Sequence, residues 1–166
     1  ILKTFEDKRM LEFCTPVIFG ATKVISYHKK VLENETQVHG ITDISQANSA
    51  KINVLNIWKE EVDIEIGTPT ATSGKYALKS LESAVNHLIE NKIDVLITAP
   101  INKENIQSDD FHFPGHTEFL EEKLEEFEET EKGDEKSKLK RWINTALSLP
   151  FDNIVTSLLS NMSHMF

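Results

Sequence analysis

Four side chains that could bind an anion lie close together in the segment "INKENIQSDDFHFPGHTEF", residues 101–119. Asn102 and Lys103 follow a proline, and His116 and Thr117 follow a Pro-Gly pair. A lysine offers a point positive charge to a phosphate or carboxylate, and the other three side chains carry hydrogen-bonding groups. This combination is typical of a site for a phosphorylated small molecule.

The second pair of these residues stands where a helix is expected to begin. Apolar residues recur every three or four positions along residues 117–128, which predicts a helix. His116 and Thr117 would open that helix, where free N–H groups and the positive end of the helix dipole attract anions. Gly115 would let the backbone approach a ligand closely. In the alternative interpretation, Thr117 is only an N-cap, His116 a surface residue and Lys103 a solvated charge.

A predicted strand precedes this segment and would place it near a ligand. The run "IDVLITA", residues 93–99, is apolar and has polar neighbours, as expected of a strand that is buried on both faces of a parallel sheet. Ligands in open parallel sheets bind beyond the carboxyl ends of the strands. Pro100 would end the strand there and turn the chain towards Asn102 and Lys103.

The remaining patterns alternate between helix and strand. Residues 1–13 and 21–34 have helical spacing, and an amphipathic helix follows Thr72 and Ser73, either of which could cap it. Strands are predicted at 15–20 and 36–41. Residues 51–67 are predicted to form two strands, either as a hairpin or as an irregular edge segment. The fold class is therefore α/β, with a parallel or mixed sheet and flanking helices.

The end of the chain has a different character. Residues 1–127 are predicted to form the α/β domain, residues 128–138 a charged linker, and residues 139–166 a helical tail of unknown role, interrupted at Pro150. The basic run at 136–141 is interpreted as a solvated helix face.

Composition excludes several classes of function. The formal net charge is −9 over 166 residues, which argues against nucleic acid or an anionic membrane surface as the main partner. No stretch of about 18 apolar residues is present that could span a membrane. Cys14 is the single cysteine, so no intramolecular disulfide can form, and it is predicted to be a buried structural thiol.

Signatures of two kinds of cofactor site are missing from the sequence. No HxxxH, HExxH or Cys/His cluster is present, so no metal ligand is assigned to this chain. No GxGxxG dinucleotide fingerprint is present either. No catalytic residue is assigned.

Two blocks of the sequence resemble a known family. "LITAPINKENIQ" followed by "FPGHTEFLEE" resembles the core signature of the 4-hydroxythreonine-4-phosphate dehydrogenases, the PdxA-type enzymes of vitamin B6 biosynthesis. Weaker similarity extends upstream through "GTPTATSGKYALKSLESAV" and "TPVIFGATKVISYHKK" to "ILKTF". The resemblance covers residues 1–124 or thereabouts, and residues 125–166 do not match.

The resemblance implies a fold and a reaction. The fold would be the two-domain α/β type shared with isocitrate and isopropylmalate dehydrogenases, here incomplete. Members oxidise 4-phosphooxy-threonine with NAD or NADP, a divalent metal ion polarises the reacting oxygen, and the oxo acid then loses carbon dioxide. The Gly-His-Thr sequence binds substrate, which gives that role to His116 and Thr117. The protein would be a cytoplasmic homodimer.

The chain also departs from the family. The family's Gly-rich loop after the first strand and its three metal-binding histidines have no counterpart here, and the true N-terminus is expected upstream of Ile1. A fragment, a fusion or truncated product, and a chain with segments missing remain open. Two other functions also remain open: a non-catalytic, truncated α/β module that binds a phosphorylated ligand or a protein partner, and a simple anion-binding domain.

Overall fold

The structure is a computed structural model that describes residues 1–63 and 65–130, with only the backbone given at 128–130. Internal contacts divide the chain into two units, Ile1–Lys123 and Leu124–Phe166. The predicted helical tail, the basic run and most of the predicted linker lie outside the described residues.

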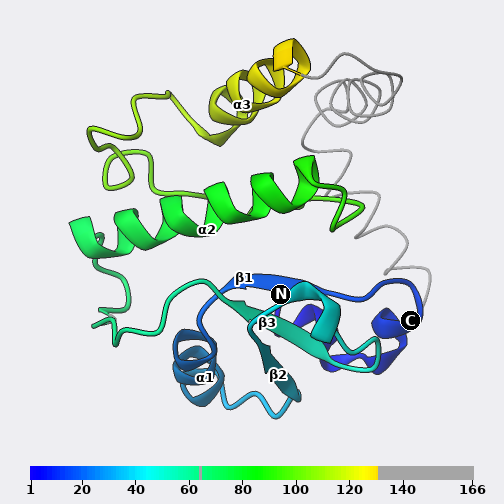
Figure 1. The fold of residues 1–166 in the computed structure, drawn as a ribbon. Coiled ribbons are helices and arrows are strands. Elements are labelled where there is room, and N and C mark those ends of the chain that lie inside the picture. Colours follow the sequence, from blue (N-terminus) through cyan, green and yellow to red (C-terminus); the bar gives the residue numbers. More distant parts are fainter. Residues whose placement is uncertain (64, 131–166) are drawn as a thin grey trace, which may run out of the picture. The chain divides into compact units, whose positions relative to one another are not determined.

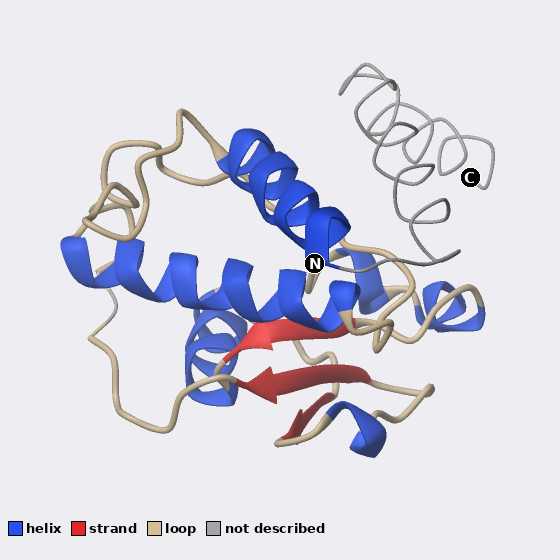
Figure 2. Ribbon diagram, turned by 45° about the horizontal axis from the view of Figure 1, so that its top comes forward, coloured by secondary structure: helices blue, strands red, loops and turns tan. Residues whose placement is uncertain are grey.

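The first unit is built on a parallel sheet of three strands, β1 (Val17–Gly20), β2 (Val38–Ile41) and β3 (Ile52–Asn56), in the order β1-β3-β2. The strands lie side by side in Figure 2. Helix α1 (Thr22–Val31) links β1 to β2, and helix α2 (Ala71–Ile89) follows β3. Figure 1 shows α1 and α2 on opposite sides of the sheet. The predicted α/β class, with a parallel sheet and flanking helices, is confirmed.

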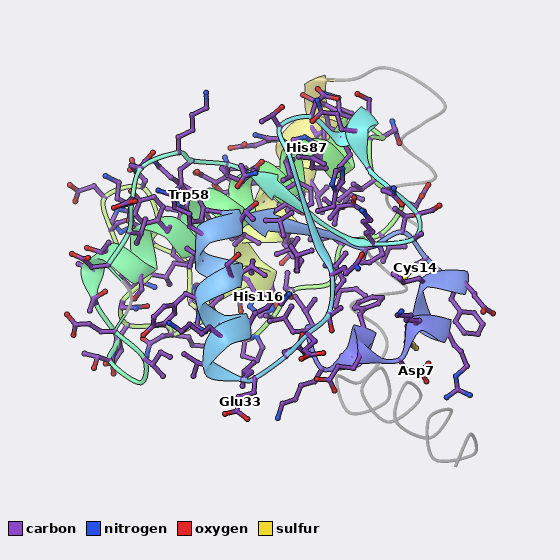
Figure 3. The ribbon with its side chains drawn as sticks, turned by 90° about the horizontal axis from the view of Figure 1, so that it is seen from below. Asp7, Cys14, Glu33, Trp58, His87 and His116 are labelled. Atoms are coloured by element: carbon purple, nitrogen blue, oxygen red, sulfur yellow. The ribbon has the colours of Figure 1, made fainter. Side chains whose placement is uncertain are left out.

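Short 3-10 helices complete this part of the chain. Two of them, Thr4–Glu6 and Lys8–Glu12, occupy the N-terminal segment that has helical spacing, and a third, Ile44–Gln46, precedes β3. Cys14 follows the second of them and is exposed (Figure 3), so the prediction of a buried thiol is wrong. Its sulfur lies 3.8 Å from the carbonyl oxygen of Met10, outside any apolar cluster of the described residues.

The central strand β3 is apolar and buried along most of its length. Ile52 and Val54 are fully buried, because a central parallel strand is covered on both faces. The polar side chain of Asn53 within this strand is also 0% exposed. Its Nδ2 donates to the carbonyl oxygens of Pro16 (3.1 Å) and Asn48 (3.0 Å), and its Oδ1 accepts from the Asn48 amide (2.8 Å). Asn53 therefore ties the start of β1 and the preceding loop to the sheet.

Asn53→Ala is expected to lower the free energy of unfolding by about 2 kcal/mol, because a fully buried side chain loses its hydrogen bonds to the Asn48 amide and to the carbonyl oxygens of Pro16 and Asn48. Urea denaturation measures the change. Asn86→Ala on the exposed side of α2 is the matched control and is expected to change stability by less than about 0.5 kcal/mol. Equal stabilities of the two variants would show that these hydrogen bonds do not hold the sheet together.

The observed N-cap of helix α2 lies two residues before Thr72, the first of the two predicted caps. Thr70 is the N-cap: its hydroxyl oxygen accepts from the Ser73 amide (3.1 Å), and the Ser73 hydroxyl oxygen accepts from the Thr70 amide (3.1 Å). This reciprocal capping box satisfies two donors that the helix leaves free. Several residues with hydroxyl groups lie close together in this segment, so their spacing alone did not identify Thr70 as the N-cap.

The prediction of a strand at 93–99 is wrong. Within the part of the chain that the structure describes, residues 93–101 form no strand and make no backbone hydrogen bond with a neighbouring strand. Val95 is 53% and Ile97 77% exposed, whereas Leu96 packs against a buried cluster beside α2. A parallel strand forms only where it pairs with a partner, and the described sheet consists of β1, β3 and β2 without this segment.

The prediction of a hairpin within 51–67 is correct only for its first strand, β3. Of the later residues, 57–63 and 65–67 form no strand in the described structure. Among the described residues, no helix combines the length and the apolar character that crossing a bilayer would require.

Candidate anion-binding site

The loop between Pro100 and the next helix begins with a tight turn built by Asn102. Its Oδ1 accepts hydrogen bonds from the amides of Glu104 (3.1 Å) and Asn105 (3.0 Å), and its carbonyl oxygen accepts from Ile106 (3.3 Å). An asparagine side chain that bonds its own following backbone is a standard way to fix a turn. Asn102 therefore shapes the turn on which Lys103 stands.

Asn105 fastens this turn to the first turn of α2. Its Nδ2 donates to the Thr70 carbonyl oxygen (3.1 Å) and to the Ser73 hydroxyl oxygen (2.8 Å). The two backbones also meet closely, since a Cβ atom built on Gly74 would lie 1.7 Å from the Asn105 carbonyl oxygen. Only glycine fits at that position, so the capped end of α2 determines where the turn of Lys103 lies.

An aromatic cluster fixes the other end of the loop. Phe111 and Phe119 are buried, and with Phe113 they form three ring pairs whose centroids are 5.3–5.5 Å apart. The cluster packs with Ile106 and with Leu78, Leu81 and Val85 of α2. Aromatic rings in contact stabilise a fold by more than their buried apolar area alone would. This cluster therefore holds the residues that flank Pro114 and Gly115 in place.

Helix α3 (His116–Thr130) starts at the predicted position. Gly115 is buried, His116 is half-buried and Thr117 is exposed at the first turn of the helix; Figure 3 labels His116. The Lys103 side chain reaches this turn, with its Nζ 3.9 Å from the position of a Cβ atom built on Gly115. The structure thus brings Lys103 to the start of α3.

The polar groups at this helix start are unpaired in the described structure. Lys103 Nζ, the His116 ring and the Thr117 hydroxyl have no hydrogen-bond or ion-pair partner there. A helix N-terminus with a lysine beside it can bind a phosphate through backbone N–H groups, the helix dipole and the ammonium charge. The arrangement therefore suits a doubly charged phosphoester.

One neighbour of this site was not predicted from the sequence. Glu118 folds back over the helix start, and its Oε2 lies 3.1 Å from the position of a Cβ atom on Gly115. An acidic residue in the first turn favours a helix through the macrodipole, which is the sequence signal that could have indicated it. Its carboxylate competes with an incoming anion for the same positive end of the helix.

A second polar cluster holds the loop that follows β3. The Tyr76 hydroxyl donates to Glu60 (3.0 Å), and the buried Trp58 ring packs on Tyr76 with centroids 4.5 Å apart. The backbone amide of Glu60 and the Tyr76 hydroxyl hold the pKa of the Glu60 carboxyl below its usual value, whereas burial and Glu60 raise the pKa of Tyr76. This cluster anchors the loop on α2.

The described residues do not fit a metal centre. No group of three or more His, Cys, Asp or Glu side chains among them is placed to hold an ion.

The fold and the site define this protein as an α/β domain with unpaired polar groups at a helix N-terminus. Comparison with known proteins extends that class: the model of the family described as "Pyridoxal phosphate biosynthetic protein PdxA" matches residues 12–133. The chain belongs to the PdxA family. The match starts later and ends later than the segment 1–124 on which the resemblance was based.

Individual relatives agree with this assignment. A 4-hydroxythreonine-4-phosphate dehydrogenase of Bacteroides thetaiotaomicron is 47% identical over 124 residues, which are 75% of this chain and 34% of that protein. A Fusobacterium nucleatum protein, provisionally named D-threonate 4-phosphate dehydrogenase, is 31% identical over 72% of this chain and 37% of its own length.

A solved structure is similar as well. The crystal structure of a 4-hydroxythreonine-4-phosphate dehydrogenase from Burkholderia phymatum has a TM-score of 0.68 and 26% identity, over 75% of this chain and 38% of that one. The chain thus spans about a third of the length of the curated relatives that it matches.

Proposed function

We propose that the start of α3, with Lys103, His116 and Thr117, binds the phosphate of 4-phosphooxy-threonine in a PdxA-type dehydrogenase. The observation that supports this most is the position of Lys103, whose Nζ lies 3.9 Å from a Cβ position on Gly115 although the chain separates the two by twelve residues. Asn102 contributes by fixing the turn beneath Lys103, and its Nδ2 remains a donor for the ligand.

Each group has a distinct role in this proposal. The Lys103 ammonium supplies charge, and the amides of the first turn of α3 supply directed donors at the positive end of the helix dipole. The Thr117 hydroxyl and the His116 ring add hydrogen bonds from the same turn. Glu118 must rotate away when the dianion enters, because its carboxylate lies at the same helix start and like charges repel.

The whole reaction is proposed by membership of the family. The hydroxyl of the phosphorylated amino acid is oxidised by NAD or NADP, and the oxo acid then loses carbon dioxide. In that reaction a divalent metal ion would polarise the reacting oxygen, although the described residues provide no site for it. The homologues named as dehydrogenases support this reading. A homodimeric assembly and a cytoplasmic location are further parts of the same proposal.

The relative from Fusobacterium nucleatum suggests a second substrate. D-threonate 4-phosphate has a hydroxyl group where 4-phosphooxy-threonine has an amino group, and the phosphoester is the same. The residues at the start of α3 would bind either compound by its phosphate. The choice between the two depends on groups that contact the other end of the molecule.

The test is calorimetric titration of the full chain with 4-phosphooxy-threonine and with unphosphorylated 4-hydroxythreonine. Loss of the phosphate is expected to weaken binding about 100-fold, since two charge-assisted contacts disappear. Lys103→Met and His116→Ala are each expected to weaken binding of the phosphorylated compound about tenfold.

Lys59→Met is the matched control, because Lys59 is exposed in the loop after β3 and its ammonium has no partner in the described structure. It is expected to bind as the unaltered chain does. Equal binding of the two threonine compounds, or no effect of Lys103→Met, would rule out this phosphate site. Tighter binding of D-threonate 4-phosphate would favour the second substrate.

The non-catalytic alternative is tested separately. NAD(P) reduction by the isolated chain, with 4-phosphooxy-threonine and a divalent ion present, would exclude it. Phosphoester binding with no response to the nicotinamide cofactor would favour an anion-binding module instead.

A further inference from the structure

Gln107 links the beginning and the end of the loop at residues 101–115 through one side-chain amide. Its Nε2 donates to the carbonyl oxygen of Phe113 at 2.8 Å and to that of Lys103 at 3.2 Å. Both neighbours are acceptors only, so the NH₂ end of the amide must face them. A primary amide carries two N–H donors, one for each carbonyl.

These two carbonyl groups have no other hydrogen-bond partner in the described structure. Lys103 and Gln107 are exposed and Phe113 is only partly buried. Water can therefore replace the Gln107 amide at either carbonyl with little cost in overall stability. Water molecules, however, would not fix the distance between the two carbonyl groups, as a single side chain bonded to both does.

The bridge spans the residues that form the site. Phe113 lies two residues before Gly115, and Lys103 is the residue whose ammonium reaches Gly115. Gln107 itself follows the buried Ile106, which packs against α2. Gln107 thus stands on a fixed point of the core and holds both sides of the loop at a set separation.

We propose that Gln107 is a positioning residue that keeps Lys103 against the start of α3, so that the ammonium and the helix amides face the same phosphate. This inference rests on the proposed function for its ligand. It adds a residue that contacts neither the phosphate nor any reacting atom.

The test uses the full chain with inorganic phosphate as the probe, followed by ¹⁵N NMR. Gln107→Met keeps the length of the side chain and removes both donors. It is expected to bind phosphate about tenfold more weakly and to shift the Gly115 and His116 amide resonances before phosphate is added. Its melting temperature is expected to stay close to that of the unaltered chain, which separates positioning from a general loss of structure.

Ser108→Ala is the matched control. Ser108 is the next residue, it is exposed, and its hydroxyl has no partner in the described structure. It is expected to match the unaltered chain in both readouts. If Gln107→Met does not fold, Gln107→Asn serves instead, because it keeps the amide but is one methylene too short to reach both carbonyl groups.

Equal dissociation constants for Gln107→Met and the unaltered chain would overturn the inference. Unchanged Gly115 and His116 resonances in the phosphate-free variant would do the same. If the unaltered chain shows no saturable response to phosphate, the proposed function fails, and the phosphate-free spectra still decide whether Gln107 sets the geometry of the loop.

Discussion

Phe111→Ala is expected to lower the free energy of unfolding by about 3–5 kcal/mol, because it removes a fully buried ring and leaves a cavity. Phe111 is 0% exposed and is in ring contact with both Phe113 and Phe119. The cavity would open between α2 and the loop before α3, so the candidate anion-binding site should lose order together with the core. Urea denaturation measures the stability.

Phe13→Ala provides the matched control, since Phe13 is 73% exposed. The same chemical change there is expected to alter stability by less than about 0.5 kcal/mol. A loss at Phe111 no greater than the loss at Phe13 would contradict the placement of the aromatic cluster in the core.

Gly74→Ala is expected to destabilise the protein by about 3 kcal/mol, at the upper end of the usual cost of overpacking. The new methyl group would lie 1.7 Å from the Asn105 carbonyl oxygen, and backbone atoms on both sides must move to admit it. The turn of Lys103 would move away from α2, so phosphate binding should weaken as well. Thermal unfolding and a phosphate titration measure the two effects.

Gly20→Ala is the control for this substitution. A Cβ atom built on Gly20 meets no atom within 4 Å, so the methyl group fits without displacement. Stability is expected to change by less than about 1 kcal/mol. If Gly74→Ala proved as stable as Gly20→Ala, the close contact between the loop and α2 would be contradicted.

The sequence predicted elements whose signal is local. Apolar residues at every third or fourth position indicated α2, because one face of that helix is buried. Short apolar runs indicated β1, β2 and β3, because strands in a sheet are buried on one or two faces. The segment 93–99 failed for a related reason: an apolar run shows that a segment can be buried, but a neighbouring strand decides whether it pairs. Val95 and Ile97 are exposed in its absence.

The site was predicted only in part. Lys103, His116 and Thr117 could be proposed from the sequence because prolines, glycines and helix starts have recognisable sequence patterns. The positions of Glu118 and Gln107 depend on which backbone groups come within reach once the loop has packed on α2. No spacing rule encodes those contacts.

The central claim is that the start of α3 binds a phosphoester, and ¹⁵N NMR of the full chain titrated with 4-phosphooxy-threonine tests it most directly. We predict saturable shifts that are largest at the amides of Lys103, Gly115, His116 and Thr117. Shifts centred on other residues, or a spectrum that does not respond to the ligand, would contradict the account.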